Sequence, residues 1–359
     1  MGRGGTAEDS VGVLRGQSFD LDEIHYLVSK RMVSETRHPE ADLSIFNYTP
    51  RAQYSGEWTD TLLACRGLIL DRDGQVVARG FPKFFNLGDP LAAQGTRWTV
   101  AEKHDGSLGI LYHLEDELRI ATRGSFTSDQ ALAGTRLLGE YEIDPDPGTT
   151  PLFEIILPEN RIVVDYGDRR ELVLLAALDN RSGQDVDLPR FSGPVAHHLE
   201  PEELGIGSLE ELLLQERENA EGWVARFEDG GRVKLKFSEY VRLHKLISGL
   251  SAKAIWDNLR NGDDLEAMIE GVPDEMYEWA RATRTRLLAE HDALRSQARS
   301  EVEAAPQGVS RREVAEYFLH RCETPSGILF AIHDGRDADD LIWKQLEPHG
   351  EEVPPGSPR

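Results

Sequence analysis

The chain has 359 residues, of which 39% are hydrophobic and 29% charged, a composition typical of soluble globular proteins. Its 64 acidic and 40 basic residues give a net charge of −24, which excludes a broad basic face for nucleic acid and leaves a local groove for any polyanion. The sequence shows no signal peptide and no apolar run of ~20 residues, and its two cysteines cannot form a disulfide framework. We therefore expect a cytoplasmic protein without membrane contact.

The predicted elements follow a loose N-terminus at residues 1–19 and begin with a short helix from Asp20. Between Cys65 and Leu178 the pattern predicts mostly strands, with one helix over 128–141. The segments expected to be strands are 65–70, 75–79, 98–103, 107–114, 117–123, 152–157, 161–166 and 171–178. A short helix over 209–217 and a hairpin with strands 221–227 and 232–237 complete this region.

Helical spacing dominates the rest of the chain. The expected helices lie within 238–247, 252–260, 274–303 and 311–321. We place a domain boundary near residue 246, which gives an α+β domain at 20–245, a small all-α domain at 246–349 and a disordered tail at 350–359. Neither part is basic, since the net charge is −15 up to Lys245 and −9 after it.

Lysine is scarce, and its positions are therefore informative. The eight lysines are Lys30, Lys83, Lys103, Lys234, Lys236, Lys245, Lys253 and Lys344. Lysine can lose its proton and act as a nucleophile, whereas arginine stays protonated. Lys103 stands in EKHDGS, between two apolar strands and before a tight turn. We expect burial near other cations to lower the pKa of this amine, although the short K-x-D-G pattern also fits an exposed hairpin lysine.

Two carboxylates and a lysine pair stand out in the same region. Glu154 lies in an apolar strand, where an ionised carboxylate needs a metal, a sugar hydroxyl or a lysine as its partner. Glu221 opens the strand that precedes Lys234 and Lys236, whose ammonium groups share one face of their strand and favour a bound anion such as phosphate. A solvated lysine pair on an exposed hairpin is the alternative.

Arg66 and Lys83 add two cations upstream, and Lys83 is followed by an aromatic pair that is typical of a core. An amine nucleophile, several phosphate-binding cations and two carboxylates suit attack on a nucleoside triphosphate in the presence of Mg²⁺.

Seven segments together resemble the ordered motifs of the ATP-dependent RNA ligases, specifically the T-even phage RNA ligase family. They are CRGLIL, KFFNLGD, EKHDGSLG, RGS-x-x-SDQA, FEIILPENRIVVDY, EGWVARFEDG and VKLKFSEYVRLH, and they span roughly residues 45–245. The resemblance implies the covalent nucleotidyltransferase fold, an ATP-grasp-like ligase domain of antiparallel sheets with flanking helices that DNA ligases and capping enzymes share. It also implies ATP and Mg²⁺ or Mn²⁺ as cofactors.

The resemblance implies a role for each matched residue. Lys103 would become covalently bound to AMP, with Asp105 and Gly106 completing its signature turn. Contacts with the nucleotide and its phosphates are implied for Arg66, Lys83, Glu102, Arg123, Glu154, Lys234 and Lys236. The divalent cation is implied at Glu221 and Glu154.

Three positions depart from the phage pattern. Arg123 stands in place of a lysine, and His104 replaces an acidic residue within the signature. Phe46 stands where the phage pattern has tyrosine, so we expect a hydroxyl contact to be missing. The helical region has no sequence match to the phage tRNA-recognition domain, so a preference for tRNA does not carry over.

The sequence thus predicts an RNA ligase that joins 5′-phosphate and 3′-hydroxyl RNA ends through lysyl-AMP, in RNA repair, and it leaves open whether a partner prepares the ends. A DNA ligase or capping enzyme is the close alternative, disfavoured because those relatives continue into an OB-fold rather than helices. A non-catalytic nucleotide- or RNA-binding relative would not need the full set of catalytic residues, whereas a protein-modifying AMP transferase would use the same first step.

Overall fold

The computed structural model describes residues 19–270, 272, 274–350 and 352–354. The chain forms two compact units, residues 1–241 and 242–359. The division falls inside helix α7 (Ser238–Gly249), a few residues before the boundary that we expected near 246. The predicted loose N-terminus lies outside the described residues except for Phe19. None of the helices in the described ranges is long and apolar enough to span a bilayer.

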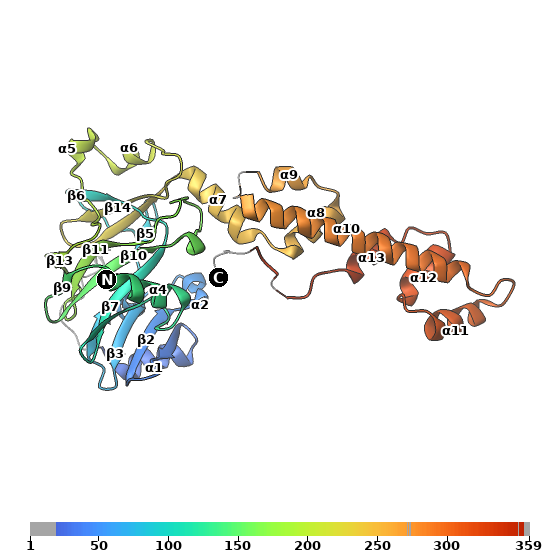
Figure 1. Cartoon of the computed structure of the whole chain (residues 1–359), viewed down its shortest axis with the longest axis horizontal. Helices are drawn as coiled ribbons and strands as arrows, with labels where there is room; N and C mark the ends of the chain where they lie inside the picture. Colours follow the sequence, from blue (N-terminus) through green and yellow to red (C-terminus); the bar gives the residue numbers. More distant parts are fainter. Residues whose placement is uncertain (1–18, 271, 273, 351, 355–359) are drawn as a thin grey trace, which may run out of the picture. The chain divides into compact units, whose positions relative to one another are not determined.

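The first unit contains three main sheets (Figure 1). The first is antiparallel, in the order β1 (Val33–Arg37), β2 (Leu43–Tyr48), β3 (Arg66–Asp71), β4 (Val76–Arg79). The second has the order β12 (Asp185–Val186), β11 (Glu171–Asp179), β10 (Thr149–Ile156), β7 (Ser107–Leu114), β8 (Glu117–Ala121). The third has the order β5 (Phe85–Asn86), β15 (Arg232–Lys236), β14 (Gly222–Phe227), β6 (Trp98–Glu102). A small two-stranded sheet pairs β9 (Ile143–Asp144) with β13 (Arg190–Phe191).

Short helices flank these sheets. In chain order they are α1 (Leu21–Ser29), α2 (Pro50–Ser55), α3 (Asp60–Ala64), α4 (Asp129–Leu138), the 3₁₀ turn η1 (Pro158–Asn160), α5 (Pro201–Leu204) and α6 (Leu209–Leu213). Side chains of Thr49, Thr59 and Ser128 accept backbone N–H groups at the starts of α2, α3 and α4, which explains where these helices begin.

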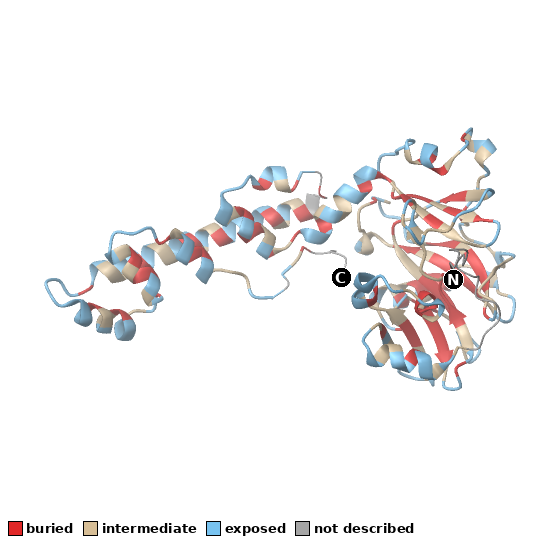
Figure 2. Cartoon of the chain, turned by 180° about the vertical axis from the view of Figure 1, so that it is seen from behind, coloured by how far each residue is buried: buried red, intermediate tan, exposed pale blue. Residues whose placement is uncertain are grey.

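Alternation along the strands places the second sheet between two apolar layers. Ile110 and Tyr112 of β7 pack with Ile69 of the first sheet, whereas Leu111 packs with Leu137 of helix α4. Figure 2 shows the buried residues concentrated along these strands. The α+β class with antiparallel sheets, followed by a helical region, is therefore confirmed.

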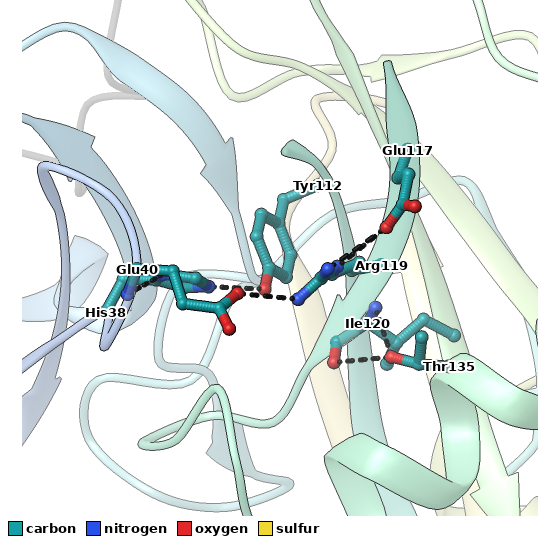
Figure 3. Close-up of polar contacts among 7 residues, drawn as sticks. All are labelled: His38, Glu40, Tyr112, Glu117, Arg119, Ile120 and Thr135. Carbon is teal, nitrogen blue, oxygen red and sulfur yellow. Dashed lines mark hydrogen bonds and ion pairs between the residues drawn. The ribbon is translucent and has the colours of Figure 1, made fainter. Parts of the chain in front are cut away.

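A polar cluster, buried at His38 and Tyr112, joins the first sheet to the second (Figure 3). His38, just after β1, lies 3.2 Å from the Tyr112 hydroxyl, and its Nδ1 accepts the Glu40 N–H at 3.1 Å. The neutral ring therefore carries its proton on Nε2 and donates to Tyr112. Burial lowers the pKa of His38, which favours this neutral form. Arg119 of β8 pairs with Glu40 at 3.3 Å and completes the connection.

Two expectations about the strands need correction. Segments 98–103 and 107–114 do form strands, but β6 and β7 belong to different sheets. The HDG segment at 104–106 therefore connects two sheets and is not the turn of a hairpin. Segment 161–166 is not a strand. Its backbone N–H groups at Val163 and Val164 donate to the Asp105 carboxylate, at 2.8 and 2.9 Å, and are not available to a sheet ladder.

The second unit is helical. Beyond α7 it contains α8 (Ala252–Asn261), α9 (Leu265–Met268), α10 (Asp274–Glu303), α11 (Arg311–Arg321), α12 (Ser326–His333) and α13 (Asp339–Gln345). Part of the predicted disordered tail is ordered, because Glu352 pairs with Arg286 at 2.8 Å and its carbonyl accepts the Ala252 N–H. The remaining tail positions, 351 and 355–359, lie outside the described residues.

Candidate active site

The ends of three adjacent strands bring Lys103, Glu221 and Lys236 together. Lys103 follows β6, Glu221 precedes β14, and Lys236 ends β15, where it stands opposite Gly222 in the strand register. The Lys103 N–H donates to the Gly222 carbonyl at 2.9 Å and extends the pairing of β6 with β14 by one residue. Sheet pairing therefore places these three side chains at the same end of the strands of the third sheet.

Glu221 bridges the two lysines. Its Oε2 lies 2.7 Å from Lys103 Nζ and its Oε1 lies 2.8 Å from Lys236 Nζ, while its own side chain is 3% exposed. Burial alone would raise the pKa of Glu221, but the two ammonium groups lower it. A buried carboxylate with both oxygens paired in this way stays ionised.

The pKa of Lys103 moves in the direction opposite to our expectation. Burial alone lowers it, but the carboxylates of Glu221, Glu154 and Asp105 outweigh burial and raise it. The expectation was wrong because it counted neighbouring cations and missed the carboxylate on the adjacent strand. The strongly lowered lysine is Lys234, whose pKa falls to about 6 through burial and the charges of Arg66, Lys103 and other cations.

Asp105 and Gly106 fix the loop that follows Lys103. Oδ1 of Asp105 accepts the Tyr240 hydroxyl at 2.7 Å, and the Asp105 N–H donates to the Tyr166 hydroxyl at 2.8 Å. Gly106 has no room for a side chain, since an added Cβ would lie 2.5 Å from the Ile155 carbonyl oxygen. Its N–H donates to Glu154 Oε1 at 3.0 Å.

Glu154, on β10 of the second sheet, faces this loop from across the sheet boundary. Burial raises the pKa of Glu154 to about 7, and the nearby Lys103 ammonium opposes that rise. The carboxyl group can therefore gain or lose a proton near neutral pH, in direct response to charge brought into the site.

Four further basic side chains lie against aromatic rings. In the described part of the chain, none of the four has a carboxylate within 4 Å. They are Arg66, Lys83, Arg123 and Lys234. The Lys83 ammonium lies 5.3 Å from the ring centres of Tyr48 and Trp58 and 5.2 Å from that of Phe85. Aromatic faces stabilise cations without neutralising their charge, so these groups remain available to an anion.

Lys234 and Arg66 share one ring of this cluster. The Phe84 centroid lies 4.7 Å from Lys234 Nζ and 5.9 Å from the Arg66 guanidinium carbon. Strand β5 pairs in parallel with β15, and its Asn86 stands opposite Lys234, which brings the KFFN segment beside the lysine strand. The aromatic pair expected to be core is half-buried and faces cations.

Sequence reasoning missed the tyrosines of the site. Phe46, the position at which we expected a missing hydroxyl, is 2% exposed in the core of the first sheet. Tyr48, two residues along, contacts Lys83 and Arg123. Strict alternation would place Tyr48 on the same face as Phe46, but the pairing of β2 with β3 shifts register between Phe46 and Asn47, so the sequence pattern gave no signal for Tyr48. Among the predicted residues, Glu102 is exposed, and its side chain makes no hydrogen bond or ion pair in the described structure.

Residues 64–196 match the sequence model of the family described as RNA ligase. The matched segment is a little over a third of the chain. It contains Arg66, Lys83, Lys103, Arg123 and Glu154, while Glu221 and Lys236 lie beyond it.

The curated proteins that are similar to this chain include two RNA ligases, one of them a putative one. "Putative RNA ligase" of Thermovibrio ammonificans is 31% identical over 199 residues, which cover 50% of this chain and 52% of that protein. "RNA ligase 1" of bacteriophage TS2126 is 33% identical over 123 residues, which cover 28% of this chain and 31% of the phage protein. The chain thus spans about half, or less, of the length of these relatives.

Among solved structures, the "Putative ATP-dependent DNA ligase from Aquifex aeolicus" aligns with a TM-score of 0.44 and 17% identity, covering 88% of this chain and 80% of that one.

Proposed function

We propose that this protein is an ATP-dependent RNA ligase whose nucleophile is Lys103. The observation that carries the proposal is the arrangement of a lysine amine paired to a buried carboxylate at 2.7 Å, beside four basic side chains whose neighbours are aromatic rings. Such a site can hold a polyphosphate next to an amine nucleophile. The family of residues 64–196 supports RNA as the strand that is joined.

In the first step the Lys103 amine attacks the α-phosphorus of ATP. A nitrogen–phosphorus bond forms, the bond from the α-phosphorus to the bridging oxygen breaks, and pyrophosphate leaves with that electron pair. Lys103 must release its proton to solvent before it attacks, because Glu221 has a lowered pKa and stays ionised. Glu221 Oε2, 2.7 Å from Lys103 Nζ, holds the amine in position. Lys236 shares this carboxylate at 2.8 Å and holds it in position.

In the second step an oxygen of an RNA 5′-phosphate attacks the adenylate phosphorus, and Lys103 leaves with the electrons of the nitrogen–phosphorus bond. In the third step a 3′-hydroxyl attacks the RNA phosphate and AMP leaves, which seals the strand. Lys234, Arg66 and Lys83 would stabilise the negative charge that moves among these phosphates.

A divalent cation fits this site when it arrives with the nucleotide. Within the described ranges, no three His, Cys, Asp or Glu side chains gather closely enough to hold a metal by themselves. Mg²⁺ is often held by one or two carboxylates together with substrate phosphates and water, and Glu221 and Glu154 would supply the carboxylates here. When bound, Mg²⁺ or Mn²⁺ would supply positive charge to the phosphates.

We further propose that the RNA ends are a 5′-phosphate and a 3′-hydroxyl, that tRNA is among the candidate RNAs, and that the reaction serves RNA repair in the cytoplasm. Ends left by other kinds of cleavage would need a partner that prepares them.

The test is formation of a covalent adduct with α-labelled ATP and Mg²⁺, separated by denaturing electrophoresis. We expect the wild-type chain to label, and Lys103→Arg to lose the label completely while keeping its fold, because arginine retains the charge beside Glu221 but supplies no neutral amine. Circular dichroism of the variant is the control. Labelling of Lys103→Arg at the wild-type rate would disprove the assigned nucleophile, and comparison of RNA with DNA ends separates the two kinds of ligase.

A further inference from the structure

Helix α2 presents an aromatic ring to solvent beside the candidate active site. Tyr54 is 88% exposed, the highest value among the large apolar side chains that the structure describes. Its neighbour Gln53 accepts a hydrogen bond from Lys83 Nζ at 2.7 Å, and Ala52 anchors the helix in the core. The Tyr54 ring thus stands in solvent one residue away from a direct contact with the cation cluster.

Arg31, in the turn between α1 and β1, lies next to the start of α2. The Thr49 hydroxyl donates to the Arg31 carbonyl at 2.7 Å, and the Thr49 N–H donates to the Met32 carbonyl at 2.9 Å. Arg31 is exposed and has a φ of +58°, in the left-handed region where a helix C-terminus usually has glycine. An arginine there is unfavourable for the backbone, so its presence points to a use for the side chain.

The two segments that meet at Thr49 are free of acidic residues. About one residue in six of the chain is acidic, yet none occurs in 24–34 or in 43–56. These segments contribute Lys30, Arg31 and Arg51, which are exposed and have no carboxylate within 4 Å in the described structure. A second exposed tyrosine, Tyr26, contacts Lys30 at 5.3 Å from ring centre to Nζ. These three cations and two exposed rings thus lie on segments that are joined by hydrogen bonds at Thr49.

We propose that this surface, which we call the α2 face and define by Tyr26, Lys30, Arg31, Arg51 and Tyr54, binds single-stranded RNA next to the end being joined. The proposal rests on the proposed function, since it assumes that the RNA end occupies the cation cluster around Lys83. Tyr54 would stack on an unpaired base, and Arg31 and Arg51 would pair with phosphates. The exposed rings can stack on unpaired bases, which an acidic protein does not have, and the cations lie next to a phosphate site. Single-stranded RNA is therefore favoured over an acidic protein as the ligand of this surface.

The first experiment measures binding of the full chain to a fluorescein-labelled, 5′-phosphorylated 12-nucleotide RNA by fluorescence anisotropy. Tyr54→Ala should weaken binding by about tenfold, whereas Tyr54→Trp should retain it because the larger ring still stacks. Leu214→Ala is the matched control, since Leu214 is 83% exposed and lies outside the α2 face. Equal binding by wild type and Tyr54→Ala, or no binding by the wild type, would overturn the proposal.

The second experiment uses Arg31→Gly, which separates RNA binding from folding. Glycine adopts a φ of +58° without the steric strain that a side chain causes, so the melting temperature should stay the same or rise. RNA affinity should nevertheless fall several-fold, and the slope of log affinity against log salt should become shallower by about 0.7. Arg190→Ala, whose native side chain is 85% exposed, should leave both quantities unchanged. A higher melting temperature with unaltered RNA affinity would assign Arg31 no role in binding.

The adduct assay distinguishes failure of this inference from failure of the proposed function. Lysyl-AMP forms without RNA, so a wild-type chain that binds RNA through Tyr54 but never labels with ATP would refute the ligase alone. A chain that labels and seals, but whose α2-face variants bind RNA like wild type, would refute the α2 face alone. Binding of a polyglutamate peptide in place of RNA would likewise overturn the inference.

Discussion

Two lysines in one cluster have pKa values displaced in opposite directions, and their neighbours explain the difference. Lys103 lies 2.7 Å from a buried carboxylate, which raises its pKa despite burial. Lys234 has cations and the Phe84 ring as neighbours, and burial is the largest of the effects that lower its pKa. In the absence of nucleotide, Lys103 is therefore protonated, while Lys234 is mostly neutral above pH 6.

The lowered pKa of Lys234 predicts that nucleotide binding takes up a proton. In the free protein the pKa is about 6, compared with 10.5 for an ordinary lysine, and a bound phosphate raises it by stabilising the ammonium form. At pH 8 an ATP analogue with a non-hydrolysable α–β bridge should therefore bind with uptake of up to one proton, and its affinity should fall as the pH rises from 6 towards 10. Isothermal titration calorimetry in buffers of different ionisation enthalpy measures this uptake.

Two variants of Lys234 serve as controls for that measurement. Lys234→Met removes the titrating group, and Lys234→Arg keeps a permanent positive charge. Both should lose the uptake, but Lys234→Arg should bind the analogue more tightly than Lys234→Met. If Lys234→Met took up as many protons as wild type, another group, such as Glu154 with its pKa of about 7, would be responsible.

At the scale of elements, the separation of β6 and β7 into different sheets places the nucleophile. The chain leaves the third sheet at Glu102 and enters the second at Ser107, so Lys103 lies where the two sheets approach each other. One sheet then supplies Glu221 and the other Glu154. The carboxylate of Asp105 and the hydroxyls of Tyr166 and Tyr240 hold the connecting loop in this position.

The close approach of β14 and β15 at Gly222 predicts a sensitive position. Gly222 has a φ of +140°, and an added Cβ would lie 1.9 Å from the Leu235 carbonyl oxygen. Gly222→Ala should therefore destabilise the protein by roughly 3 kcal/mol or more and disturb the pairing that positions Lys103 and Glu221. Chemical denaturation measures the loss of stability, and the ATP adduct assay measures the effect on the site.

The matched control is Gly124→Ala, because nothing lies within 4 Å of a Cβ added at Gly124. Its denaturation midpoint should stay close to that of the wild type. Equal stability of the Gly222→Ala and wild-type proteins would show that the strands can separate here without cost, contrary to our account of the site.

At the scale of the whole molecule, all the candidate catalytic residues belong to the first unit, residues 1–241. The chain after Lys245 carries a net charge of −9, so the helical unit is not suited to bind RNA by broad electrostatics. We interpret it as a unit that tunes the choice of substrate while the first unit performs the chemistry.

A chain ending at Gly249, the last residue of α7, tests this division. It retains Tyr240, which donates to Asp105, and should form the Lys103 adduct at close to the wild-type rate. Sealing of structured RNA should fall by more than sealing of a simple single strand, since structured RNA can use an additional docking surface. Circular dichroism and a melting curve must first show that the shortened chain is folded. A folded chain without the adduct would mean that the helical unit completes the active site.

Local patterns explain what could be predicted from the sequence. Alternating or continuous apolar residues indicated β3, β4, β10, β11, β14 and β15, and helical spacing indicated α4 and α10, because these signals depend on residues close together in the chain. Strands β1 and β2 were not predicted, and the apolar segment 161–166 was predicted as a strand although its N–H groups are bonded to Asp105. The periodicity of apolar residues indicates which side chains are buried, but it does not indicate which groups the backbone N–H groups bond to.

By itself the sequence determined the chemical groups of the site and their order along the chain, since residue types and spacing in the EKHDGS and KLK segments need no fold to be recognised. The tertiary structure alone decided which charges meet. Glu221 lies 118 positions from Lys103 in the chain, yet sheet pairing brings them to 2.7 Å and reverses the expected pKa direction of the lysine. Electrostatic interaction depends on distance in space and on burial, and both are set by packing between strands that are remote in sequence.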